Sequence, residues 1–287
     1  QEAATTAVRN NLIDYDTRHG YRGPAEVLWK QNETAWTAEQ IVEKLKKMPV
    51  YGPLMPAVVT SATASEAQVM LADGSQIPIT MTGVRWARKF ISDTQQGAAP
   101  RAVNAVMQVG EQIWVRKVKD NWWLGQVPDA NAAFVALNPN DGAIIALVGG
   151  FDFNMSEFNR VTQSLRQVGS NIKPFLYTAA MDKGLTLSSL LNDVPISRWD
   201  AGAGSDWRPK NSPPRYDGPI RLRQGLGQSK NVVMVRAMRA MGVDYAADYL
   251  TRFGFPAENI NRTEALALGA PSFTPMQMVR GYAEIGR

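Results

Sequence analysis

The sequence has 287 residues, which is long enough for two domains, and its 45% hydrophobic and 20% charged residues are typical of a folded globular protein rather than of a disordered chain. It has no cysteine and a single histidine, His19, which excludes disulfides and thiolate metal sites and leaves little material for a zinc site or a Ser-His-Asp triad. The net charge of +5 is mildly basic and no dense basic run accompanies it, which indicates a solvated surface or attraction to an anionic partner.

The chain begins with a predicted helix over residues 1–16, because Ala7, Leu12, Ile13 and Tyr15 fall near one face at helical spacing. The stretch RHGYRGP then breaks this helix with two glycines and a proline. The chain opens on Gln1 without a basic and apolar leader, and its apolar runs are too short to cross a bilayer. We therefore expect any signal or membrane anchor to lie outside this sequence.

Residues 35–127 have the pattern of short strands separated by turns. The clearest turn candidates are Ala72-Asp73-Gly74 and Lys119-Asp120-Asn121, each between two runs rich in β-branched and aromatic residues. The stretches that carry this pattern are 57–63, 66–81 and 111–127. Several short strands in so short a segment predict a small barrel or sandwich.

The remainder of the chain combines a hairpin with helices. Residues 132–153 form two apolar runs joined by an Asn-Pro-Asn-Asp-Gly turn, and helices are predicted over 170–183, 231–241 and 245–253. A further helix is predicted over 274–285, with Thr274-Pro275 as its N-cap and first helical position. This order predicts an α+β domain with helices packed on an antiparallel sheet.

Ser170 and Lys173 lie three residues apart, directly after Gly169, in the stretch RQVGSNIKPF. At a helix start, residues i and i+3 share one face at roughly 5–6 Å between Cβ atoms, so the lysine amine can reach the serine hydroxyl. A lysine of lowered pKa can remove the proton of a serine, and a helix N-terminus offers an N–H and a positive dipole end to an oxyanion. An isolated S-x-x-K also arises by chance, in which case both residues only cap and solvate a helix.

A second polar site lies in the stretch LGQSKN, which places Ser229 and Asn231 at a turn leading into a helix. The hydroxyl of Ser229 could relay a proton between Lys173 and a leaving amine, while the Asn231 amide could hold Lys173 and a substrate carbonyl. Serine and asparagine are also favoured helix N-caps, so this site alone leaves both interpretations open.

Three stretches together resemble the transpeptidase domain of bifunctional class A penicillin-binding proteins: FNRVTQSLRQVGSNIKPF, WRPKNSPPRYDGPIRLRQGLGQSKN and LALGAPSFTPMQM. That superfamily carries the motifs S-x-x-K, S-D-N and K-T-G. Here the first is Ser170–Lys173 and the second appears as Ser229-Lys230-Asn231. RNNLIDYDTRHGYRGP and the strand-rich segment resemble the linker and inserted OB-like domain of the 1A type of Gram-negative bacteria. The domains expected from this resemblance are a linker helix and connection at 1–34, an OB-like β domain at 35–129 and a transpeptidase domain at 130–287.

The resemblance implies that Ser170 forms an acyl-enzyme with a D-Ala-D-Ala stem peptide and that Lys173 takes the hydroxyl proton. Ser229 and Asn231 would complete the proton path and orient the substrate. A second stem peptide would then resolve the ester to form a peptidoglycan cross-link, and β-lactams would acylate the same serine. Neither a metal nor a cofactor is implied.

K-T-G occurs nowhere in the 287 residues, and we expect the glycosyltransferase domain of this family to lie outside them. We therefore expect a truncated transpeptidase domain from a longer protein, which would be anchored on the periplasmic side of the inner membrane and carry a glycosyltransferase domain elsewhere. The lysine of the third motif and the second oxyanion N–H would be missing from this chain. The activity of this exact chain is left open.

Four tryptophans, Trp86, Trp114, Trp122 and Trp123, concentrate in the strand-rich segment. Exposed aromatics on an OB-like barrel would bind single-stranded nucleic acid, but indoles are usually buried. We therefore expect most of these tryptophans to fill the core of the barrel or its contact with the transpeptidase domain, and we expect no nucleic-acid partner. The resemblance also implies docking of a periplasmic regulatory protein on this domain. The alternative to an enzyme is a non-catalytic module that binds peptidoglycan or nucleic acid. A serine β-lactamase is a third alternative, but this sequence shows no obvious deacylating glutamate.

Overall fold

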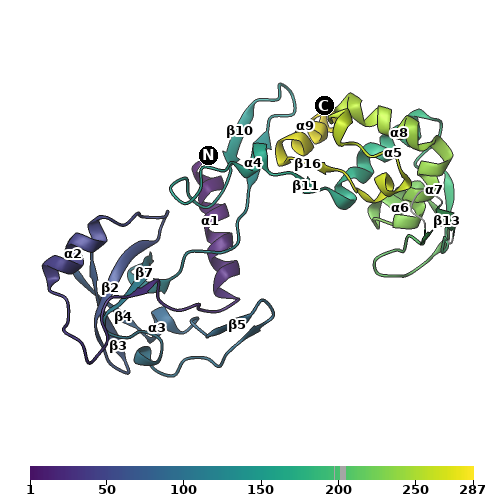
Figure 1. The fold of residues 1–287 in the computed structure, drawn as a ribbon. Coiled ribbons are helices and arrows are strands. Elements are labelled where there is room, and N and C mark those ends of the chain that lie inside the picture. The colour runs from purple at the N-terminus through teal and green to yellow at the C-terminus, as the bar shows by residue number, and fades with distance from the viewer. Residues whose placement is uncertain (197, 201–204) are drawn as a thin grey trace. The chain divides into compact units, whose positions relative to one another are not determined.

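The computed structural model describes residues 1–196, 198–200 and 205–287. The chain forms two compact units, and Figure 1 shows both. The first comprises Gln1–Phe134 and Val148–Asn159, and the second comprises Val135–Leu147 and Arg160–Arg287. The domain boundaries expected at residues 34/35 and 129/130 stay a prediction.

The first unit is built on one antiparallel sheet with the strand order β1-β7-β2-β3-β4, in which β8 also pairs with β7. The helices and strands of this part are α1 Glu2–Thr17, β1 Glu26–Val27, α2 Ala38–Lys46, β2 Met55–Ala62, β3 Glu66–Leu71, β4 Gln76–Thr80, α3 Met81–Val84, β5 Phe90–Ser92, β6 Gln95–Gln96, a 3₁₀ turn at Val103–Ala105, β7 Glu111–Val118 and β8 Asn121–Gly125. Both predicted hairpin turns are confirmed: Gly74 and Lys119 adopt positive φ angles of 82° and 54° between paired strands.

Both faces of the sheet in the first unit carry buried side chains. Neighbouring residues of a strand point to opposite faces, so they enter different clusters. Val59 and Val69 lie in the core that also holds Leu124, whereas the adjacent Val58 and Met70 pack against α2. Helix α2 was missed in a segment expected to contain only strands. Its sequence signal is a capping box in which Thr37 accepts from the Gln40 N–H and Gln40 accepts from the Thr37 N–H.

The predicted N-terminal helix is confirmed as α1, but its predicted buried face is partly wrong. Val8, Leu12, Ile13 and Asp16 are buried, whereas Ala7 and Tyr15 are exposed. The i, i+4 and i, i+8 spacing of the observed set fits a helical period of 3.6 residues better than the predicted set does.

The second unit contains most of the described helices, and Figure 1 shows α5 in teal next to α7 and α8 in green. Its elements are β9 Phe134–Leu137, which begins at the last residue of the first unit, β10 Ile144–Val148, α4 Arg160–Gln163, β11 Arg166–Gln167, a 3₁₀ turn Gly169–Ile172 (η2), α5 Lys173–Asp182, β12 Leu190–Asp193, β13 Arg198–Asp200, β14 Ser205–Trp207, β15 Gly218–Arg221, α6 Leu222–Gly227, α7 Asn231–Met241, α8 Val243–Leu250, 3₁₀ turns at Thr251–Phe253, Ala257–Asn259 and Glu264–Leu268, β16 Ser272–Phe273 and α9 Pro275–Gly286. The expected α+β class is confirmed, as is the Thr274 cap of α9.

The core of the second unit is made by helices packed on one another rather than on a broad sheet. Phe175, Leu176, Met234 and Leu250 are fully buried in one cluster contributed by α5, α7 and α8. Within the described ranges its strands form only two-stranded ribbons, namely β9–β10, β11–β16, β12–β15 and β13–β14. A ribbon of two strands is marginal alone, so the helical cluster supplies most of the buried apolar area here.

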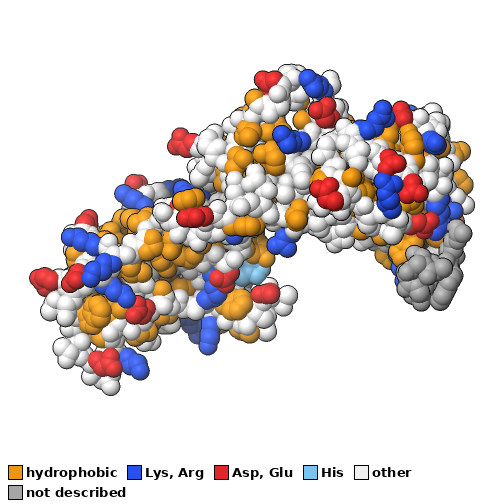
Figure 2. All heavy atoms as spheres, turned by 45° about the horizontal axis from the view of Figure 1, so that its top comes forward, with side chains coloured by type: hydrophobic (Ala, Val, Ile, Leu, Met, Phe, Trp, Pro, Cys, Tyr) orange, Lys and Arg blue, Asp and Glu red, His pale blue; other side chains and the backbone are white. Residues whose placement is uncertain are grey.

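The surface carries no single block of charge on the face drawn in Figure 2, where basic and acidic side chains are interspersed. This distribution fits the interpretation of the +5 net charge as a solvated surface. In the described part of the chain, no helix has the length and apolar character needed to span a bilayer.

Candidate functional site

A backbone frame holds the turn that carries Ser170. The N–H groups of Val168 and Gly169 donate to the carbonyl oxygens of Pro271 and Gly269, both at 3.0 Å. Gly269 has a φ of 76°, and a Cβ built on it would lie only 1.9 Å from the Gly169 carbonyl oxygen. Position 269 therefore requires glycine, because of its positive φ and because the two segments approach each other too closely for a side chain.

Ser170 lies in a 3₁₀ turn and Lys173 directly follows it as the first residue of α5. The α-helix was expected to begin at residue 170, so it begins three residues later than expected. Pro174 has no N–H to donate to the Ser170 carbonyl, which accepts instead from the N–H of Lys173. Because residues i and i+3 eclipse in a 3₁₀ turn, the two side chains project from the same face. Ser170 is exposed, and neither its hydroxyl nor its backbone N–H has a hydrogen-bond partner among the described residues.

The amine of Lys173 lies in a buried cage of oxygen atoms, since the residue is only 1% exposed. It donates to the Ser229 carbonyl at 2.7 Å, to the Ser229 hydroxyl at 3.0 Å and to Asn231 Oδ1 at 2.7 Å. No carboxylate pairs with it in the described ranges, so no opposite charge offsets the loss of solvation of the charged form. Burial accordingly lowers the pKa of Lys173 to about 8.

The cage can hold the amine in its neutral form. A neutral amine has two N–H donors and one lone pair, and the Ser229 carbonyl and Asn231 Oδ1 can only accept. These two oxygens therefore take both donors, which leaves the lone pair free to accept a proton from a hydroxyl. The structure thus brings Lys173, Ser229 and Asn231 into hydrogen-bond contact, with Ser170 on the same turn as Lys173.

Ser229 and Asn231 are held in specific conformations. Ser229 has a φ of 52°, in the left-handed region that residues other than glycine rarely adopt. The amide nitrogen of Asn231 donates to the Lys210 carbonyl at 2.8 Å, which directs its oxygen toward Lys173. Strained backbone held by its surroundings is frequent at functional sites, which supports the assignment of this turn as part of the site.

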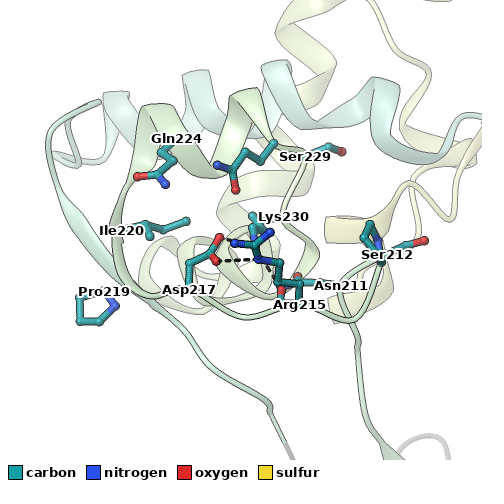
Figure 3. Close-up of a pocket in the computed structure, with 11 residues that line it drawn as sticks. Asn211, Ser212, Arg215, Asp217, Pro219, Ile220, Gln224, Ser229 and Lys230 are labelled. Atoms are coloured by element: carbon teal, nitrogen blue, oxygen red, sulfur yellow. Dashed lines mark hydrogen bonds and ion pairs between the residues drawn. The ribbon is translucent and has the colours of Figure 1, made fainter.

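A cluster of charged residues beside this site was not found from the sequence. The amine of Lys230 lies 2.9 Å from Asp193 and 2.7 Å from Asp217, and Asn211 donates to Asp193 at 2.7 Å. Three of these residues line a cavity of about 600 Å³ that Ser229 also borders (Figure 3). No spacing rule connects segments this far apart in the chain, so the sequence offers no signal for the cluster.

The four tryptophans singled out from the sequence are at least partly covered by other side chains. Trp86 donates to the Leu124 carbonyl at 2.9 Å, Trp122 packs against the core around that residue, and Trp114 lies 5.1 Å from the ring of Tyr51. The fourth, Trp123, has a guanidinium 5.6 Å above its ring. The described residues contain no group of three histidine, cysteine or acidic side chains arranged to hold a metal ion.

Comparison with known proteins assigns both halves of the chain. The family model described as "Penicillin-binding protein OB-like domain" matches residues 21–130, and "Penicillin binding protein transpeptidase domain" matches residues 132–287. Proteins named penicillin-binding protein 1A from Escherichia coli (strain K12) and Vibrio cholerae are 72% and 52% identical to this chain, each over 99% of its length.

A crystal structure of penicillin-binding protein 1A from Haemophilus influenzae has a TM-score of 0.87 and 50% identity, and covers 99% of this chain and 40% of its own. The matches to the E. coli and V. cholerae proteins cover 33% and 35% of those proteins, so the chain spans about a third of the length of the curated relatives. Because the transpeptidase model covers just over half of the chain and the OB-like model most of the remainder, the chain belongs to the penicillin-binding protein family.

Proposed function

We propose that the full-length protein containing this chain is a D,D-transpeptidase that cross-links peptidoglycan stem peptides through an acyl-enzyme on Ser170. The observation that carries this proposal is the buried amine of Lys173, held by Ser229 and Asn231 and set on the same turn as an exposed serine. A serine hydroxyl becomes a nucleophile when a neighbouring base removes its proton. Membership of the family supports the same assignment.

The contacts of Lys173 with Ser229 and Asn231 support the following catalytic roles. Lys173 in its neutral form takes the hydroxyl proton as Ser170 Oγ attacks the carbonyl carbon of the penultimate D-alanine. The Ser170 N–H stabilises the oxyanion, as a free backbone N–H at a helix start does. The proton then passes from Lys173 through the Ser229 hydroxyl to the amine of the departing D-alanine, and Asn231 holds both Lys173 and the peptide.

The second half of the reaction returns the enzyme to its starting state. The amine of a second stem peptide attacks the Ser170 ester and loses a proton along the same path. A new amide bond forms, and Ser170 regains its hydroxyl proton. A β-lactam would acylate Ser170 by opening its ring, and its ring nitrogen would receive the proton.

Several parts of this proposal concern the full-length protein. Its K-T-G motif would lie outside this chain and supply the cation that binds the substrate carboxylate and the second oxyanion N–H. The greater length of the relatives leaves room for a glycosyltransferase domain and a membrane anchor. Such an anchor would hold the reaction at the periplasmic face of the inner membrane. The OB-like domain would serve as the docking site of a periplasmic regulatory protein.

The test is covalent labelling of the full-length protein with a fluorescent penicillin, followed by intact mass measurement and peptide mapping. We expect one adduct, located on Ser170, which is absent in Ser170→Ala and forms far more slowly in Lys173→Ala. Retention of labelling in Ser170→Ala would refute the proposed nucleophile. A protein that takes up no label but retains purified peptidoglycan would instead be a non-catalytic binding module.

A further inference from the structure

The middle residue of the S-K-N stretch, Lys230, is a buried cation paired with two carboxylates. It is 7% exposed and lies between Ser229 and Asn231 in the chain. Its amine contacts Asp193 Oδ2 at 2.9 Å and Asp217 Oδ2 at 2.7 Å, and donates to the Arg215 carbonyl at 3.1 Å. Figure 3 shows Lys230 pointing toward Asp217 and Arg215, with these contacts drawn as dashed lines. Every donor of the ammonium group thus has an acceptor.

Asp193 is the centre of this cluster and has no exposed surface. It is the last residue of β12, where it pairs with Gly218 of β15. Burial disfavours its ionised form, but bonds from the Asn211 amide, the Lys230 ammonium and the Asp217 N–H outweigh it and hold its pKa below the usual value. The carboxylate therefore remains an anion that receives three donors.

Asn211 carries the constraint from Asp193 to the first turn of α7. Its amide nitrogen donates to Asp193 Oδ1 at 2.7 Å, and its amide oxygen accepts from the N–H of Val232 at 3.1 Å. The neighbouring Lys210 carbonyl accepts from the amide nitrogen of Asn231 at 2.8 Å. Because that nitrogen is already engaged, the Asn231 oxygen must face Lys173.

We propose that Asp193 and Lys230 are positioning residues that hold the Ser229–Asn231 stretch in the conformation needed for acylation. Lys230 fixes the chain directly after Ser229, whose left-handed backbone needs support from its surroundings. Asp193 fixes the amide of Asn231 through Asn211. A buried ion pair is a weak source of stability compared with well-packed apolar residues, whereas its directional contacts fix geometry. This inference rests on the acyl-transfer function proposed above.

The experiment measures acylation of the full-length protein by a fluorescent penicillin at several concentrations, which separates the initial binding constant from the acylation rate constant. Asp193→Asn and Lys230→Met should each lower the acylation rate constant at least tenfold and change the initial binding constant less than threefold. The reason is that the contacts of the cluster lead to the turn that holds the base and its partners, whereas its own charges are already paired with one another. Asn211→Ala removes the same link without removing a charge and should act in the same direction.

The matched control is Arg239→Met, which removes a cation of α7 that pairs with Glu264 at 2.6 Å. It should lower the melting temperature and leave the acylation rate constant unchanged. Circular dichroism establishes whether each variant is folded. If Asp193→Asn or Lys230→Met does not fold, the acylation rate constant of Asn211→Ala tests the inference. Wild-type acylation rates in folded Asp193→Asn or Asn211→Ala would overturn the inference and leave the Ser170 mechanism intact. Labelling that persists in Ser170→Ala would instead defeat the mechanism itself.

Discussion

Lys173 should set the pH dependence of Ser170 acylation, because only its neutral amine can accept the hydroxyl proton. Burial lowers its pKa from the ordinary 10.5 to about 8. At pH 7 roughly 10% of the amine is then neutral, against about 0.03% for an unshifted lysine, which is a gain of roughly 300-fold in the active form. The lowered pKa of Lys173 should therefore account for a large part of the acylation rate at neutral pH.

The assay is the acylation rate constant of the full-length protein at a saturating concentration of fluorescent penicillin. The rate should rise about tenfold between pH 6 and pH 7, reach half of its maximum near pH 8 and level off above pH 9. Lys183→Met, which removes an exposed lysine after α5, should keep this profile and serves as the control. A rate that is flat from about pH 6 to 10, or that still climbs at pH 10, would refute the assignment of Lys173 as the buried base.

The same pKa shift predicts the direction of a stability change. Below about pH 8 the amine is protonated in both states, and the folded state carries the full desolvation penalty; above 10.5 the amine is neutral in both and the penalty is absent. The free energy of unfolding should therefore rise by about 2–3 kcal/mol between pH 7 and pH 10, relative to Lys173→Met. Denaturant unfolding of both proteins at the two pH values measures this difference. Equal pH dependence of the two proteins would contradict it.

Two substitutions test the packing around the site. Gly269→Ala should distort the turn of Ser170, because its Cβ would lie 1.9 Å from the Gly169 carbonyl oxygen; we expect a lower melting temperature and slower acylation. Gly254→Ala is its matched control, since that glycine has a similar φ of 81° but no atom within 4 Å of the new Cβ, and it should slow acylation little. Tyr177→Phe should unfold at the same or a higher temperature, because the buried Tyr177 hydroxyl has no hydrogen-bond partner in the part of the chain that the structure describes. A destabilisation of more than about 1 kcal/mol in Tyr177→Phe would show that the hydroxyl is bonded in solution.

Much of the candidate site could be predicted because it depends on short spacings. The three-residue separation of Ser170 and Lys173 places both side chains on one face whether the turn is α or 3₁₀. The Thr274 cap and the Lys119 turn are equally local, since a few neighbouring residues determine their backbone angles. The motif order then made the family resemblance specific, although each motif alone is weak.

The sequence by itself determined these local elements, the hairpin pairing and the identity of the polar residues that meet in the site. Only the tertiary structure decided that Lys173 is buried, that Ser229 is left-handed and that Lys230 meets Asp193. The physical reason is that burial, charge pairing and backbone strain depend on segments far apart in the chain. Periodicity and turn chemistry act over a few residues, so they predict which groups are available but not which environment each one receives.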